Sequence, residues 1–188
     1  CTIVKKMYDE EGIEIPKEMA GILISGIISD TLFFKSPTTT NIDKQVLEEL
    51  NSVVGLDLDE YVANMFRVGT SLENESIEEI FYKEFKEFYE DDFKLGVSQV
   101  FTMDIDDVFN RENEFLDYLV KVKLENNHNM TLLLVTDIIK NGSHLLYKTK
   151  NNNIIKRAFN IEPTQGIFLP GILSRKKQVV PKILNALE

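Results

Sequence analysis

Apolar residues in the first 69 positions recur every three or four places, which is the period of an amphipathic helix. The pattern predicts helices over residues 17–29, 42–54 and 58–69, and no strand. Thr40 and Asp43 stand three residues apart just before the second helix, as the two members of a capping box do. This part of the chain is therefore expected to be helical throughout.

Beyond residue 75 the pattern changes to alternating strands and helices. Residues 130–135 form an unbroken apolar run, as in a strand covered on both faces, and Gly96 is expected to mark a bulge or turn. The predicted strands are 86–91, 94–103, 130–135, 145–148 and 166–169, and the predicted helices are 105–126 and 152–159. This alternation indicates an α/β fold with a mixed sheet flanked by helices.

The short polar stretch 70–75 is expected to be a linker. It would join a helical part, residues 1–69, to a small α/β domain, residues 76–188. The first residue is Cys1 and not methionine, so we expect the chain to be a fragment of a longer protein.

Charge is distributed unevenly along the 188 residues, whose formal net charge is −10. Residues 1–69 carry −6, residues 70–118 carry −11 and residues 119–188 carry +7. The acidic remainder argues against nucleic acid as a partner, and the basic final third suggests a local anion site. No apolar run reaches the roughly 18 residues of a membrane-spanning helix. The single cysteine fits a reducing compartment, so we expect a cytoplasmic protein.

Three consecutive cations, Arg175, Lys176 and Lys177, precede an amphipathic run that contains Pro181. If a helix begins near Lys177, the cations stand at its positive end, where they are unfavourable unless an anion is bound. Arg175 and Lys176 would then lie on the preceding turn, outside the core and free to hold that anion. The alternative is a solvated basic turn, which is the commoner outcome for a run of charges.

Asp30 and Lys86 are two further candidates. Asp30 ends an apolar helix and precedes Thr31–Phe34, surroundings in which a carboxylate needs a partner, a metal or a capping role. Lys86 lies among five acidic residues and forms either a surface ion pair or part of a site. The only histidines, His128 and His144, are far apart in sequence and do not suggest a metal site within this chain.

The segments Ser29–Thr38 and Ser174–Pro181, taken together, resemble family II inorganic pyrophosphatases, which are DHH phosphoesterases that depend on Mn²⁺ or Co²⁺. The resemblance implies that residues 1–69 are the helical C-terminal part of the metal-binding DHH domain. Residues 76–188 would be the DHH-associated C-terminal domain that binds substrate. The Asp-His-His motif of the family is absent.

The same resemblance implies the roles of four residues. Asp30 would be a metal ligand, and Lys86, Arg175 and Lys176 would bind pyrophosphate, which the intact enzyme hydrolyses to two phosphates. It also implies Mn²⁺ or Co²⁺ with Mg²⁺ as a further activator, a homodimer in the intact enzyme, and no membrane or nucleic acid partner. The chain alone is expected to be inactive, because one carboxylate does not hold a metal cluster. The alternatives are a non-catalytic phosphate- or partner-binding module and a DHH phosphoesterase acting on oligophosphates or oligonucleotides.

Overall fold

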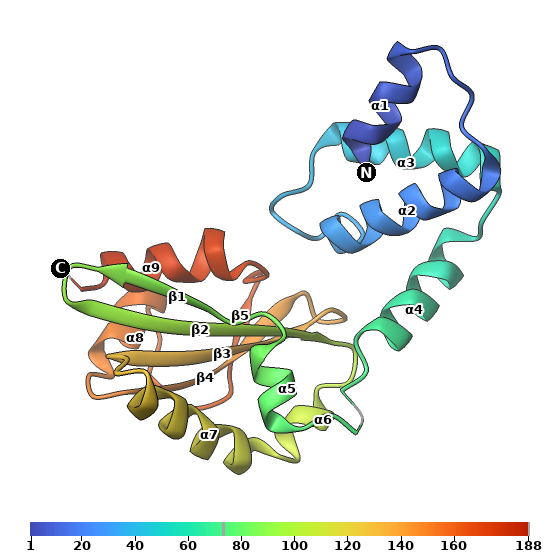
Figure 1. Ribbon diagram of the computed structural model, residues 1–188. Coiled ribbons are helices and arrows are strands. Elements are labelled where there is room, and N and C mark those ends of the chain that lie inside the picture. Colours follow the sequence, from blue (N-terminus) through green and yellow to red (C-terminus); the bar gives the residue numbers. More distant parts are fainter. Residues whose placement is uncertain (73, 188) are drawn as a thin grey trace. The chain divides into compact units, whose positions relative to one another are not determined.

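A computed structural model describes residues 1–72 and 74–187 of the chain (Figure 1). Its contacts divide the chain into two compact units, Cys1–Phe66 and Arg67–Glu188. Helix α4 (Leu58–Gly69) runs across this division. None of the described helices combines the length and the apolar character that a membrane span requires.

The first unit is built from helices, as the periodicity predicts. Its other helices are α1 (Thr2–Glu10), α2 (Lys17–Thr31) and α3 (Asn41–Val54). The capping box before α3 is confirmed: the Thr40 hydroxyl accepts the Asp43 N–H at 3.3 Å, and the Asp43 carboxylate accepts the Thr40 N–H at 2.8 Å. Helices α2 and α3 bury the apolar stripe between them, formed by Leu23, Ile24, Ile27, Ile28, Val46, Leu47 and Leu50.

The second unit contains a five-stranded sheet in the order β1-β2-β3-β4-β5. Strands β2 and β3 are parallel and the other neighbours are antiparallel, so the predicted mixed sheet is confirmed. The strands are β1 (Lys86–Glu90), β2 (Phe93–Thr102), β3 (Met130–Asp137), β4 (Gly142–Thr149) and β5 (Ile167–Pro170). The helices are α5 (Ile77–Tyr82), α6 (Asp106–Phe109), α7 (Glu112–Glu125), α8 (Asn153–Phe159), the π-helix η1 (Arg175–Val179) and α9 (Val180–Asn185).

Helices cover both faces of this sheet (Figure 1). One face packs against α8, η1 and α9, through a core that includes Val97, Leu132, Leu145, Ile155 and Ile183. The opposite face packs against α5, α6 and α7, through a core that includes Phe81, Val100, Phe115, Leu119 and Leu133. Alternate residues of β2 and β3 therefore enter different cores, which explains why β3 is buried at every position.

Three local predictions were wrong. The single helix expected over 105–126 is two helices, α6 and α7, separated at Asn110 and Arg111. Gly96 marks no turn but lies inside β2 opposite Glu87, where the ring of His128 comes too close for a side chain at that position. The basic segment is part of a helix from Arg175 onward instead of starting near Lys177, because the Ser174 side chain caps it by accepting the Lys177 N–H.

Candidate functional site

The sheet brings Lys86 to the same face as the basic segment. Lys86 stands opposite Val97 in the antiparallel β1–β2 ladder, and paired residues in such a ladder point to the same side. Val97 belongs to the core beneath α8, η1 and α9. Lys86 itself is exposed at the edge strand of the sheet, so its ammonium group is available to solvent on the face that η1 covers.

Arg175, the first residue of η1, is buried and not on a free turn as expected. Its residue exposure is 7%, and its Nη1 donates to the main-chain carbonyls of Glu84 and Val97, the latter at 3.3 Å. Its Nη2 lies 3.6 Å from the Glu84 carboxylate. Burial lowers the pKa of Arg175 from its usual value, and the Glu84 charge opposes that shift.

These bonds bring Arg175 beside Lys86, although the two are 89 positions apart in sequence. Glu84 precedes Lys86 by two residues, and Val97 is the residue that pairs with Lys86 across the β1–β2 ladder. The guanidinium therefore bonds to two main-chain carbonyls close to Lys86, one in the turn before β1 and one on β2. Two of the predicted substrate-binding cations thus share one corner of the sheet.

The backbone at Arg175 is held by a buried side-chain network. The Gln99 carbonyl accepts the Arg175 N–H at 3.0 Å, and the Gln99 amide donates to Thr136 Oγ1 at 2.9 Å and to the Leu173 carbonyl at 3.1 Å. Thr136 in turn lies 2.9 Å from the Ser143 hydroxyl. These side chains are 0–4% exposed and lie on the same face of the sheet as Val97. They therefore form a buried polar network at one end of an otherwise apolar core.

Gln178 folds the turn before η1. Its side-chain carbonyl accepts the N–H groups of Leu173 and Ser174, each at 2.9 Å, and its amide donates to the Gly171 carbonyl at 2.8 Å. The side chains of Gln99 and Gln178 thus form hydrogen bonds with backbone N–H and C=O groups of segment 171–175. Within the described part of the chain, these groups have no partner in a helix or in the sheet. The π-helix that follows is a rare conformation found frequently at functional sites.

Lys176 and Lys177 are exposed on η1. Within residues 1–72 and 74–187, neither their ammonium groups nor that of Lys86 forms an ion pair or hydrogen bond. One buried, oriented guanidinium is therefore followed along η1 by two exposed lysines, and Lys86 stands on the edge strand nearby. Such a set suits an anion with several charged oxygens, since arginine offers a planar fork and lysine a mobile point charge.

Asp30 belongs to the first unit, where it is exposed near the C-terminal end of α2. Leu32, Phe33 and Phe34 follow it with φ angles of 48°, 47° and 68°, a left-handed run that is rare for such side chains. No group of three or more His, Cys, Asp or Glu side chains able to hold a metal ion occurs among the described residues. Asp30 thus offers one free carboxylate and does not form a metal site with this chain's other described residues.

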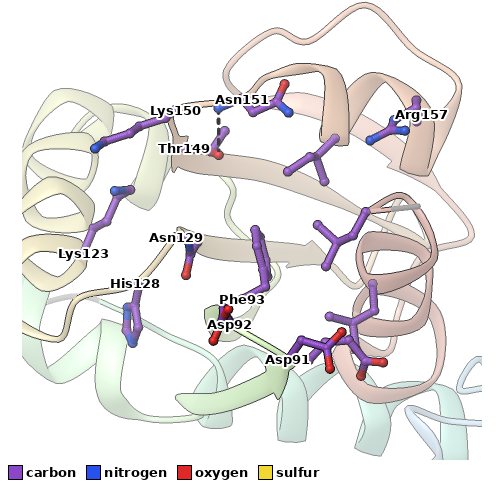
Figure 2. Close-up of a pocket in the computed structure, with 14 residues that line it drawn as sticks. Asp91, Asp92, Phe93, Lys123, His128, Asn129, Thr149, Lys150, Asn151 and Arg157 are labelled. Atoms are coloured by element: carbon purple, nitrogen blue, oxygen red, sulfur yellow. Dashed lines mark hydrogen bonds between the residues drawn. The ribbon is translucent and has the colours of Figure 1, made fainter.

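A pocket of about 670 Å³ lies elsewhere in the second unit, between the β1–β2 hairpin, α8 and α9 (Figure 2). The close-up shows Lys123 and Lys150 on the side away from Asp91. Glu90, Asp91 and Asp92 all line this pocket, whereas none of the four predicted site residues does. The three carboxylates offset the charges of the three cations that also line the pocket, Lys123, Lys150 and Arg157, so the corner at Arg175 is the better candidate site for a multivalent anion.

Three residues of the site were missed by sequence reasoning: Glu84, Gln99 and Gln178. Gln99 carried a signal, because it is a polar residue in the strand segment Leu95–Phe101, on the face that Leu95 and Val97 turn to the core. Glu84 carried none, since it acts largely through its main-chain carbonyl. His128, to which sequence reasoning assigned no role, is 3% exposed, and its ring nitrogens form hydrogen bonds with Thr131 and Glu87.

Comparison with known proteins agrees with this architecture. The model of the DHHA2 domain family matches residues 63–186. The chain is 46% identical over its whole length to a protein of Clostridium acetobutylicum named "Probable manganese-dependent inorganic pyrophosphatase". The chain belongs to the family II inorganic pyrophosphatases.

Two further matches place the chain within this pyrophosphatase family. It is 44% identical over 183 residues, 97% of its length, to the cobalt-dependent inorganic pyrophosphatase of Clostridium perfringens, of which it covers 33%. A crystal structure of a Methanococcus jannaschii protein, described as a candidate family II inorganic pyrophosphatase, superposes with a TM-score of 0.84 at 32% identity. That match covers 98% of this chain and 63% of the other. The chain spans 61% of the length of the Clostridium acetobutylicum relative.

Proposed function

We propose that this chain is the substrate-binding part of a manganese- or cobalt-dependent enzyme that hydrolyses inorganic pyrophosphate to two phosphates. Lys86, Arg175 and Lys176 bind the pyrophosphate, and Asp30 serves as one metal ligand of the full-length protein. The observation that carries the proposal is the corner itself, where a buried guanidinium lies beside Lys86 and begins the helix that carries Lys176. The names of the relatives support the substrate and the metals.

Pyrophosphate suits this corner because its negative charge is spread over two phosphoryl groups. Arg175 is held by main-chain carbonyls, so its plane is oriented before the substrate arrives. Lys86 and Lys176 are exposed and able to follow different oxygens of the anion. Neutralising the charge of a transferring phosphoryl group is the main task of a protein in such reactions, and these three side chains are suited to it.

The chain alone is proposed to bind substrate without turning it over. The metal chemistry of the family needs several converging ligands, and Asp30 forms no group of three or more possible ligands with the other described residues. In the same proposal residues 1–69 end a DHH domain, residues 70–75 link it to the substrate domain 76–188, and the full-length enzyme is a cytoplasmic homodimer.

Substrate competition tests this assignment. The full-length protein, assayed with Mn²⁺, is expected to hydrolyse pyrophosphate in preference to tripolyphosphate and to short RNA. A preference for either of the other two substrates would contradict the pyrophosphatase assignment and favour a different phosphoesterase. Turnover of pyrophosphate by the 188-residue chain itself, at a rate near that of the full-length protein, would contradict the proposed inactivity.

A non-catalytic phosphate-binding module is the second candidate. It is favoured by one observation, the lack of a three-ligand metal group among residues 1–72 and 74–187. Mass spectrometry of the protein isolated from its natural source separates the two candidates. If the isolated protein carries an Asp-His-His segment, the enzyme is supported. If it lacks such a segment, the binding module is supported.

A further inference from the structure

The guanidinium of Arg175 uses its two edges differently. Nη1 donates to two main-chain carbonyls and is fully committed. Nη2 makes only an ion pair at 3.6 Å with the Glu84 carboxylate, which is too long for a hydrogen bond. Nε is buried and has no hydrogen-bond partner among the described residues. The edge formed by Nε and Nη2 is therefore the under-used edge of a buried cation.

Such an edge has a high affinity for a tetrahedral anion. Two parallel N–H donors of a guanidinium match two oxygens of a phosphate, and bonds of this kind are about twice as strong as neutral ones. A buried donor without a partner also costs free energy that a bound anion recovers. The edge of Arg175 that remains after Nη1 is anchored is thus the edge expected to meet a phosphoryl group.

Glu84 performs two separate tasks at this place. Its main-chain carbonyl accepts bonds from Arg175 and from the Gln99 N–H, the latter at 3.3 Å, and so belongs to the scaffold. Its carboxylate is 56% exposed and makes no hydrogen bond to Arg175. The carboxylate is therefore not needed to hold the fold, yet it places a negative charge beside the edge where an anion would bind.

We propose that the Glu84 carboxylate competes with pyrophosphate for Arg175 and thereby sets how tightly the substrate binds. This inference rests on the proposed function. With no anion bound, Glu84 partly neutralises the guanidinium. When pyrophosphate arrives, its oxygens take the Nε–Nη2 edge and the carboxylate turns into solvent. Glu84 thus acts as a specificity-determining residue, because a weakly charged anion displaces it less readily than a multivalent one.

The test measures pyrophosphate binding to the 188-residue chain by calorimetry, in buffer without divalent metal. Glu84→Gln keeps the size of the side chain and the main-chain carbonyl but removes the charge. Glu90→Gln removes the same charge from an exposed residue of β1 that has no contact with Arg175. Glu84→Gln is expected to bind about 2- to 5-fold more tightly than wild type, the range of a partly exposed ion pair. Glu90→Gln is expected to bind as wild type does.

A second measurement follows Arg175 directly. The chain has four arginines, so the Nε–H resonance of Arg175 is assignable in a ¹⁵N spectrum from its loss in Arg175→Lys. That resonance is expected to shift when pyrophosphate is added, and to reach its end point at a lower concentration in Glu84→Gln. Equal melting temperatures of wild type, Glu84→Gln and Glu90→Gln would show that the difference in affinity does not come from unfolding.

The outcomes separate this inference from the function on which it rests. If wild type binds and Arg175→Lys weakens binding, but Glu84→Gln binds no better than Glu90→Gln, the competition is overturned and the substrate site stands. If no variant binds, or Arg175→Lys binds as wild type, the substrate site is overturned and the competition with it. In the full-length enzyme Glu84→Gln is expected to lower KM with little change in kcat. A lower kcat at unchanged KM would instead indicate a structural role and contradict the inference.

Discussion

The side-chain carbonyl of Gln99 accepts the backbone N–H of Arg175 at 3.0 Å and so joins strand β2 to the first residue of the π-helix. Replacing Gln99 by Leu removes this acceptor and leaves the Arg175 N–H and the Leu173 carbonyl buried without partners. Gln99→Leu is therefore expected to lower the free energy of unfolding by about 1–3 kcal/mol in urea denaturation. Pyrophosphate affinity should fall as well, because the Arg175 backbone that positions the guanidinium is no longer held in place.

The matched control for that change is Gln45→Leu. Gln45 is exposed on α3 in the first unit, and surface substitutions of this kind usually stay within about 0.5 kcal/mol. A Gln99→Leu protein as stable as Gln45→Leu, with unaltered pyrophosphate affinity, would contradict the role assigned to the network.

The spacing of apolar residues predicted the main helices and strands but did not predict the contacts that bring Arg175 beside Lys86. Apolar residues spaced for a helix or a doubly covered strand identified α2, α3 and β3 to within two residues of their ends. The resemblance selected Lys86 and Arg175, but the pattern along the chain held no information that the Glu84 carbonyl would lie between them. A main-chain acceptor has no side-chain signature, and a contact over 91 positions depends on how the sheet is assembled.

The break between α6 and α7 has a similar cause. Residues 105–126 keep a helical spacing of apolar side chains on both sides of Asn110 and Arg111, so nothing in the spacing announces an interruption. Arg111 donates to the Glu75 carbonyl at 2.8 Å, and this contact with a distant segment accompanies the break. Tertiary contacts of this kind override local propensity.

Arg175→Lys tests both the chemistry and the burial of the site. Lysine keeps the charge but loses the fork, and a lost charge-assisted bond of about 1.5–3 kcal/mol lowers kcat/KM of the full-length enzyme by roughly 10- to 150-fold. The sequence alone suggested no cost in stability. The observed burial predicts one of about 1–3 kcal/mol, because the carbonyls of Glu84 and Val97 lose their shared donor.

Activity and stability must therefore be measured on the same Arg175→Lys preparation, well below its melting temperature. Lys177→Arg is the comparison, since Lys177 is exposed and its replacement keeps the charge. Full activity of Arg175→Lys would argue against a substrate role. A loss that disappears when the folded fraction is taken into account would argue for a purely structural one.

Gly96 is predicted to be intolerant of any side chain. A Cβ at this position would lie 2.5 Å from Cε1 and 2.7 Å from Nδ1 of His128. The ring is fixed by Thr131 and Glu87, so it does not yield cheaply, and Gly96→Ala should cost about 1–3 kcal/mol of stability. Gly21→Ala is the control: its Cβ meets nothing within 4 Å in helix α2, and a gain of up to about 1 kcal/mol is expected. Equal melting temperatures for the two variants would contradict the close contact at His128.

The contact between Glu87 and His128 makes stability depend on pH. Glu87 Oε1 lies 2.7 Å from Nε2 of His128, and its carboxylate also accepts bonds from Tyr89 and Lys94. These bonds, that of His128 foremost, lower the pKa of Glu87 from 4.5 to about 2. Because the folded pKa is the lower one, the stabilisation is complete above pH 4.5 and is lost as the pH falls toward 2.

Glu87→Gln is accordingly expected to be less stable than wild type at pH 7 by about 1–3 kcal/mol, a range that allows for the partial exposure of the carboxylate. The difference should shrink by more than half at pH 3, since most of the interval between the two pKa values has then been crossed. Urea denaturation at pH 7, 5 and 3 measures it, with Glu90→Gln as the variant that removes a charge from the same strand without touching His128. A Glu87→Gln deficit that stays constant over this range would mean that the carboxylate acts through its shape and not through its charge. Because Glu87 is the neighbour of Lys86 on the edge strand, the same loss of stability at low pH would loosen the strand that carries Lys86, the proposed substrate-binding lysine.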